Sequence, residues 1–115
     1  MLTADGILNS SDLSDLKKVN VPEWGGEVYI RVMTGIERDR WEIAATSAMK
    51  DTQTLNIRAT LCAICICDDK GKRLFTDEQA QALGEKSSLA LGRVFEVARH
   101  LNRLTDRDLE ELEGN

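Results

Sequence analysis

Alternating apolar and polar residues near the N-terminus predict a small β-hairpin. Residues 18–21 form a short candidate strand whose two valines point to one face. Pro22 closes this strand, since proline has no N–H to donate to a ladder, and residues 23–26, EWGG, are typical of a turn. In residues 27–33 every second residue is valine or isoleucine, which is the pattern of a half-buried strand. The two runs predict one hairpin at residues 18–33.

A capping-box spacing predicts the first helix. Thr34 and Glu37 are three positions apart, so that each side chain reaches the backbone N–H of the other, and a helix should follow from Gly35 to about Met49. Its core face is expected to carry Ile36, Ile43 and Ala44, with Trp41 on the flank. Its solvated face is expected to carry the charged residues Glu37, Arg38, Asp39, Arg40 and Glu42.

Helical spacing of apolar residues predicts further helices in the second half of the chain. Residues 55–67 are apolar nearly all round after Arg58, which indicates burial in the middle of the fold or in a subunit contact. A second capping-box spacing at Thr76 should open a short helix through Leu83. The longest helix is expected at residues 85–103. Its expected core residues are Leu91, Val94, Phe95, Ala98 and Leu101.

Together these elements predict a mostly α-helical α+β domain at residues 1–104, with about four helices and one N-terminal hairpin. Residues 2–16 mix leucines with serines and aspartates, and only short helical turns are expected there. Residues 105–115 hold five acidic side chains and one basic side chain, and they are expected to form an acidic C-terminal helix or tail with Leu109 and Leu112 on one side.

The charge distribution argues against a nucleic-acid ligand. The net charge is −5, and the acidic end at residues 105–115 accounts for nearly all of it. A DNA or RNA binder normally has a basic stripe, and no run in this sequence supplies one. Apolar runs also stay well short of the roughly 20 residues that span a bilayer, so a cytoplasmic protein with no membrane partner is expected.

Three cysteines within a short stretch raise the question of a metal site. Cys62, Cys65 and Cys67 lie on an expected helix, where the 100° step per residue turns Cys67 away from the other two. Structural zinc takes four ligands, usually two pairs from separate parts of the chain, and only one cluster is present. We therefore expect small, buried thiols and no metal or other cofactor.

The turn after the cysteines contains aspartates and a glycine, as a calcium-binding loop does, but its spacing does not match one. With Gly71 at the sixth position of such a loop, Ile66 falls at the first ligand position and Lys70 at the fifth, so two oxygen ligands are missing. Residues 68–71, DDKG, are instead expected to end a helix and form a turn.

No group of residues is expected to be catalytic. His100, the sole histidine, lies one helical turn after Glu96 on the polar face, which favours a solvated surface residue. Trp24 at the hairpin tip must either fold back on the domain or contact a partner, and both interpretations stay open.

Several blocks of the sequence, taken in order, resemble one protein family. These are VPEWG at residues 21–25, TGIERDRWE at 34–42 and GKRLFTDE at 71–78. Over residues 18–115 the chain resembles the small tail assembly chaperones of long, non-contractile-tailed (siphovirus, lambda-like) phages and prophages, in the short form made without a frameshift. The cysteines are not part of this pattern.

The resemblance implies a non-catalytic protein of the bacterial host cytoplasm. Such chaperones bind the tape measure protein and help the tail tube protein to polymerise around it, and they leave before the virion is finished. The almost wholly apolar helix at residues 55–67 suggests a homo-oligomer as well. The expected partner-binding residues are Trp24, Leu109 and Leu112. A small prophage-encoded adaptor or regulatory protein remains the alternative.

Overall fold

The fold is described from a computed structural model of the 115-residue chain, which covers residues 1–50 and 57–104, without the side chains of 45–50. Its elements, in chain order, are α1 (Ala4–Leu8), β1 (Lys17–Val21), the 3₁₀ turn η1 (Pro22–Trp24), β2 (Gly26–Ile30), α2 (Gly35–Lys50), α3 (Ile57–Cys65), β3 (Ile66–Cys67), the 3₁₀ turn η2 (Asp77–Gln79), α4 (Ala80–Gly84) and α5 (Ser88–Leu101). The predicted mostly helical α+β class is confirmed.

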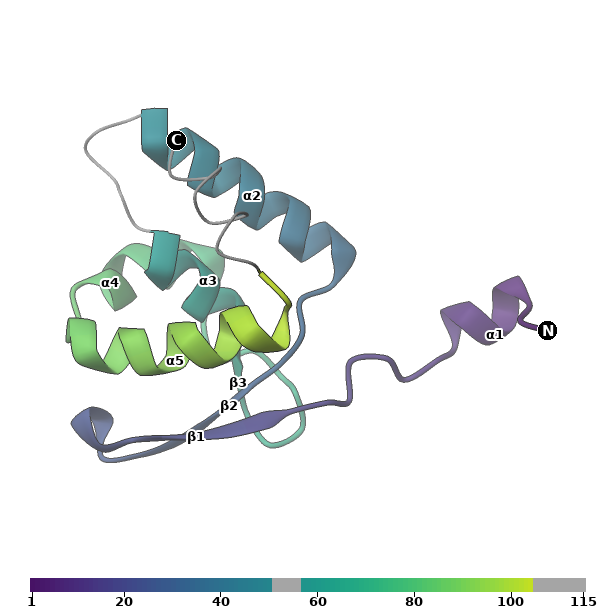
Figure 1. Cartoon of the computed structure of the whole chain (residues 1–115), viewed down its shortest axis with the longest axis horizontal. Helices are drawn as coiled ribbons and strands as arrows, with labels where there is room; N and C mark the ends of the chain where they lie inside the picture. The colour runs from purple at the N-terminus through teal and green to yellow at the C-terminus, as the bar shows by residue number, and fades with distance from the viewer. Residues whose placement is uncertain (51–56, 105–115) are drawn as a thin grey trace.

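A small antiparallel sheet with strand order β1-β2-β3 lies beneath the helices (Figure 1). The predicted hairpin is confirmed as β1 and β2, with Val19 opposite Val28. The tip turns through η1 to Gly25, whose positive φ of 76° favours glycine. The second strand ends at Ile30 and not at Met33, so the predicted strand was too long.

The third strand was missed in the sequence. Ile66 pairs with Ile30 and Cys67 with Tyr29, whereas both residues were expected to continue the preceding helix. Because both lie in one unbroken apolar run, periodicity alone does not separate a buried helix from a buried strand.

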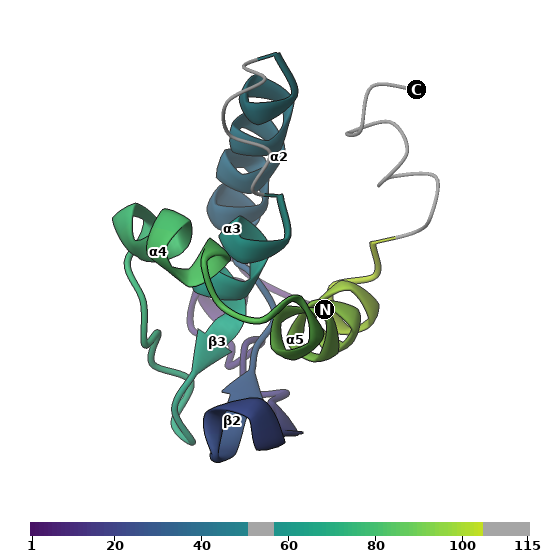
Figure 2. The same cartoon turned by 90° about the vertical axis from the view of Figure 1, so that its left-hand side faces the viewer.

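Helix α3 occupies the centre of the fold, with α2, α4 and α5 packed around it (Figure 2). Its Leu61, Cys62 and Cys65 have no exposed surface, which confirms the predicted central burial. The covering elements belong to the same chain, so α3 does not by itself require a second subunit.

The predicted core face of α2 is wrong, although the helix itself begins at Gly35 as expected. Ile36 and Ile43 are 66% and 67% exposed and Ala44 is exposed, while Trp41 is fully buried. At 100° per residue, Trp41 lies about 140–160° around the helix from the two isoleucines. The buried face is therefore the one that carries Glu37, which was expected to be in solvent.

Helix α5 packs against α3 and β1 with the predicted apolar face. Leu91, Val94, Phe95 and Ala98 are buried as expected, and Leu101 is half-buried. The helix begins at Ser88 and not at Glu85, because the Ser87 side chain caps it by accepting from the N–H groups of Leu89 and Ala90 at 3.1 and 3.4 Å. With 14 residues it is shorter than α2, which has 16, so the expectation that it is the longest helix is also wrong.

Residues 1–16, named here the N-terminal arm, extend away from the rest of the molecule (Figure 1). Its one short helix, α1, agrees with the expected helical turns, and residues 1–15 are all exposed. Across the described residues, no helix is long and apolar enough to cross a membrane.

Candidate functional site

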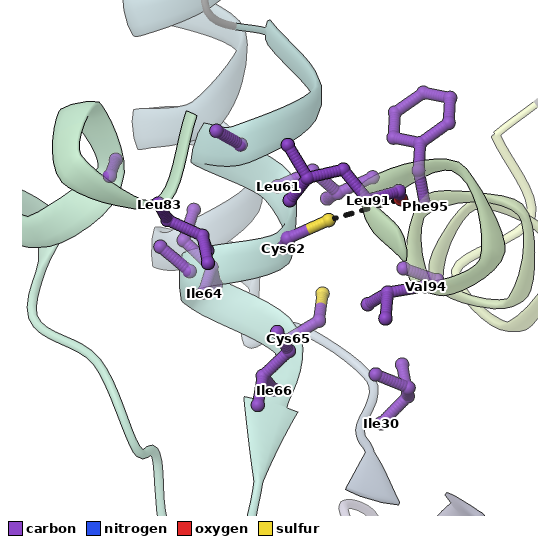
Figure 3. Close-up of a cluster of buried hydrophobic side chains, with 14 of the residues drawn as sticks. Ile30, Leu61, Cys62, Ile64, Cys65, Ile66, Leu83, Leu91, Val94 and Phe95 are labelled. Atoms are coloured by element: carbon purple, nitrogen blue, oxygen red, sulfur yellow. Dashed lines mark hydrogen bonds between the residues drawn. The ribbon is translucent and has the colours of Figure 1, made fainter. Parts of the chain in front are cut away.

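The three cysteines are buried in or beside the core, as predicted. The Cys62 sulfur lies 3.8 Å from the Leu91 carbonyl oxygen, between α3 and α5 (Figure 3). Burial raises the pKa of Cys62 and of Cys65 to about 12. Within residues 1–50 and 57–104, no three His, Cys, Asp or Glu side chains are grouped so that they could hold a metal ion. The thiols act as small apolar filler.

Replacing Cys62 with serine is expected to lower the free energy of unfolding by about 1–3 kcal/mol, because burying a hydroxyl costs more than burying a thiol and the nearby Leu91 carbonyl oxygen lies 3.8 Å from the sulfur, beyond hydrogen-bond distance for an oxygen donor. Urea titration of both proteins measures the change. Cys62→Ala is the matched control, since it removes the sulfur without adding a polar group. A serine variant as stable as the wild type would contradict the filler role.

The DDKG segment at residues 68–71 is a turn, as predicted, but it follows β3 and does not end a helix. Gly71 has a positive φ of 85°, and its N–H donates to the Asp68 carbonyl oxygen at 3.1 Å. The Asp68 carboxylate accepts from the N–H groups of Lys70 and Lys72, both at 2.9 Å. These backbone bonds lower the pKa of Asp68, and the carboxylate closes the turn.

His100 is exposed at the polar face of α5, where sequence analysis placed it. Its Nε2 lies 3.6 Å from a Glu96 carboxylate oxygen. The two side chains are one helical turn apart at the surface, and such contacts are common on exposed helix faces.

A buried ion pair links the end of the sheet to α2, and sequence analysis did not find it. The Arg31 guanidinium donates to both carboxylate oxygens of Glu37, at 2.8 and 2.5 Å, and to the carbonyl oxygen of Ile64 at 3.1 Å. The two side chains are only 6% and 16% exposed. Burial by itself raises the pKa of Glu37, but hydrogen bonds from Arg31 and Thr34 outweigh it and hold the pKa below its ordinary value.

The same carboxylate also caps α2, and a second arginine extends the cluster. Glu37 accepts from the Thr34 N–H at 2.9 Å while the Thr34 hydroxyl accepts from the Glu37 N–H at 3.1 Å, which confirms the predicted capping box. Arg73 donates to the Ala63 carbonyl oxygen at 3.1 Å and pairs with Asp77 at 2.8 Å. Two guanidinium groups thus satisfy carbonyl groups at the end of α3.

Asn102, at the end of α5, joins this region to the helix layer. Its side-chain oxygen accepts from the Met33 N–H at 2.7 Å, and its amide donates to the Ala98 carbonyl oxygen at 2.9 Å. Arg38 donates to the Asn102 carbonyl oxygen at 3.2 Å. These bonds fasten α2 and α5 to the segment that follows β2, so they hold the fold together.

An apolar hollow lies between the hairpin tip and α4, and we name it the Trp24 hollow. It measures about 250 Å³ and is lined by Trp24, Phe75, Gln79, Ala82, Leu83 and Lys86. Trp24 is half-buried against the core, so the interpretation in which it folds back is confirmed. The neighbouring Glu23 pairs with Arg93 of α5 at 3.0 Å, which fixes the tip to the helix layer.

A larger and more polar groove of about 740 Å³ runs between the base of the N-terminal arm and the end of α5. Its lining includes the acidic residues Asp12, Asp15 and Glu96 and the basic residues Lys17 and Arg103. Because its lining carries both signs of charge, the groove favours no ligand of one charge.

Of the three expected partner-binding residues, the structure describes only Trp24. Leu109 and Leu112 lie outside the described residues. The exposed large apolar side chains are an additional feature that the sequence pattern did not identify. In the described residues they are Met1, Leu2, Ile7, Leu8, Leu13, Ile36, Ile43, Leu74 and Leu89.

Comparison with known proteins identifies the family. The model of the phage tail assembly chaperone family matches residues 5–114, nearly the whole chain. No curated protein and no solved structure matches the chain. The family match covers all the sequence blocks on which the resemblance was based, and with it the N-terminal arm from Asp5 onwards. This chain therefore belongs to the phage tail assembly chaperone family, whose members are not catalysts.

Proposed function

We propose that this chain binds the tape measure protein of its phage, keeps it soluble and promotes polymerisation of the tail tube protein around it. It acts in the bacterial host cytoplasm and does not remain in the virion. The observation that carries this proposal is the family match over residues 5–114. The many exposed apolar side chains support it, because a chaperone needs apolar surface for contact with a client.

The proposed client contact lies in the acidic end, residues 105–115. Leu109 and Leu112 supply apolar contact there, and the surrounding carboxylates keep the complex soluble. We propose that residues 1–104 fold as a domain without this segment. Leu104 supports this boundary, because its side chain is only 3% exposed and belongs to the core.

A chain that ends at Leu104 is expected to keep its melting temperature but to recover less of a tape measure fragment. Leu109→Ala with Leu112→Ala should reproduce most of the loss, because each buried leucine contributes about 1.5–3 kcal/mol, or about tenfold or more in affinity. Co-purification of the fragment, quantified against the full chain, measures the effect.

Glu110→Gln with Glu111→Gln is the matched control, since it changes charge in the same segment and keeps both leucines. Equal recovery by the truncated and the full chain would move the client contact to another surface. No recovery of the fragment by any of these proteins would favour the adaptor interpretation over the chaperone.

We also propose that the chain self-associates, but through a different surface from the one that the sequence pattern suggested. The apolar helix that suggested it, α3, is covered within the chain. Exposed apolar residues on the N-terminal arm provide the surface instead.

A further inference from the structure

The N-terminal arm concentrates exposed apolar surface. Five of the nine large apolar side chains that are exposed in the described residues belong to it, including Ile7 and Leu8 at 55% and 81% exposed. Isolated exposed leucines are common, but several in one protruding segment are typical of a surface that contacts a partner.

Helix α1 has the pattern of a docking element. Ala4, Ile7 and Leu8 follow the i, i+3, i+4 spacing and share one face, with Asp5 at its side. Thr3 caps the helix by accepting from the Gly6 N–H at 3.1 Å. With only five residues and no buried side chain, α1 is far below the length of about 12–15 residues at which an isolated helix becomes even marginally stable. A surface that covers its apolar face would stabilise such a helix.

The Trp24 hollow provides a surface of matching size. Its lining is mainly apolar, with Trp24, Phe75 and Leu83 at its walls, and its volume is about 250 Å³. Since an apolar cavity of about 150 Å³ holds a benzene molecule, the hollow has room for one or two aliphatic side chains.

The charges of the two surfaces are complementary. Lys86 is the charged residue in the lining of the hollow. The arm, residues 1–16, contains three aspartates and no lysine or arginine. An arm residue such as Asp5 would therefore meet a cation at the edge of the hollow, and opposite charges across an interface fix its register.

The arm of a given chain points away from its own hollow. The arm leaves the body at the start of β1, whereas the turn η1, which contains Trp24, follows the other end of that strand. In Figure 1, α1 and the tip of the hairpin lie at opposite sides of the molecule. We propose that α1 of one chain docks into the Trp24 hollow of a second copy, with Ile7 and Leu8 in the hollow and Asp5 beside Lys86. This inference rests on the self-association proposed above and names its surface.

Disulfide trapping between full-length chains tests the contact. One chain carries Leu8→Cys and a differently tagged chain carries Ala82→Cys, on the exposed edge of the hollow. After the two are mixed at micromolar concentration and oxidised with diamide, a crosslinked pair of one chain of each kind is expected to accumulate. A disulfide forms only when the two Cα atoms come within about 7 Å. The native thiols are buried and do not compete.

The matched control pairs Leu8→Cys with Ile43→Cys, an exposed position on α2. The Ala82→Cys pair should crosslink several-fold faster than this control, and equal rates would overturn the proposal. A chain carrying both Leu8→Cys and Ala82→Cys that closes on itself would show that its own arm fills the hollow, which also overturns it. Maleimide labelling of the Ala82→Cys thiol gives a third outcome. If the thiol is labelled at the full rate in the protein alone and is protected only when a tape measure fragment is added, the hollow binds the client and the proposal is overturned.

Light scattering provides a second readout. The wild-type mass at micromolar concentration should exceed the 12.8 kDa of one chain, and Ile7→Asp should return it to that value. Ile43→Asp, which adds the same charge at another exposed isoleucine, should leave the larger mass unchanged. A wild-type mass of one chain at every concentration contradicts the contact. Because the crosslinking and light-scattering experiments contain no client, their failure is distinguishable from failure of the chaperone proposal.

Discussion

Replacing Glu37 with alanine is expected to lower the free energy of unfolding by about 3–5 kcal/mol, the range for removing one partner of a buried ion pair. The change leaves the Arg31 guanidinium, only 6% exposed, without the two carboxylate oxygens to which it donates. It also removes the acceptor of the Thr34 N–H at the start of α2. Urea titration, with the midpoint and slope compared between variant and wild type, measures the loss.

Glu42→Ala is the matched control, because Glu42 lies on the same helix and pairs with Arg38 at 3.1 Å with both side chains partly exposed. An exposed pair of this kind contributes about 0–1 kcal/mol. If the two alanine variants were equally stable, the buried pair would not be an important stabilising contact. Adding Arg31→Met to Glu37→Ala should recover part of the loss, since the unpaired charge is then removed as well.

Local patterns in the sequence predicted the elements that depend on neighbouring residues. The hairpin followed from alternation in residues 27–33 together with the turn that contains Gly25, and the start of α2 followed from the spacing of Thr34 and Glu37. The turn at Gly71 likewise needed only local chemistry. In each case the bonds that define the element join residues close in the chain.

Features that depend on distant contacts were not predictable in this way. Strand β3 exists because Ile66 and Cys67 meet β2, which lies more than thirty residues earlier in the chain. The charged residue Glu37 is buried because Arg31, at the end of the sheet, turns towards it and towards the Ile64 carbonyl oxygen. A charged cluster on a helix is normally solvated, so the sequence pattern favoured the opposite face.

In the candidate site, too, the sequence predicted what depends on neighbouring residues and missed what depends on distant contacts. Trp24 was identified because an indole at a hairpin tip is unusual, but the hollow beside it also needs Phe75 and Leu83, which come from later elements. The exposure of Ile7 and Leu8 depends on where the N-terminal arm leaves the body, and helical spacing does not give that. The client contact proposed for Leu109 and Leu112 lies outside the described residues and stays a prediction.

Replacing Trp41 with alanine is the second change with a large expected effect, a loss of about 3–5 kcal/mol in the free energy of unfolding. Trp41 has no exposed surface, and its indole N–H donates to the Ile57 carbonyl oxygen at the start of α3, at 3.3 Å. Truncation therefore opens a cavity between α2 and α3 and removes a hydrogen bond that joins the two helices. Thermal or urea unfolding of the variant measures the loss.

Ile43→Ala on the same helix is the sharpest control, because the apolar pattern of α2 assigned Ile43 to the core and Trp41 to the flank, while the structure has Ile43 67% exposed. An exposed substitution of this kind changes stability by about 0.5 kcal/mol or less. A large loss for Ile43→Ala with a small one for Trp41→Ala would mean that α2 is rotated by about half a turn about its axis. That rotation would also take Glu37 away from Arg31. The Trp41→Ala and Glu37→Ala substitutions therefore test the same placement of α2, one through an apolar contact and the other through an ion pair.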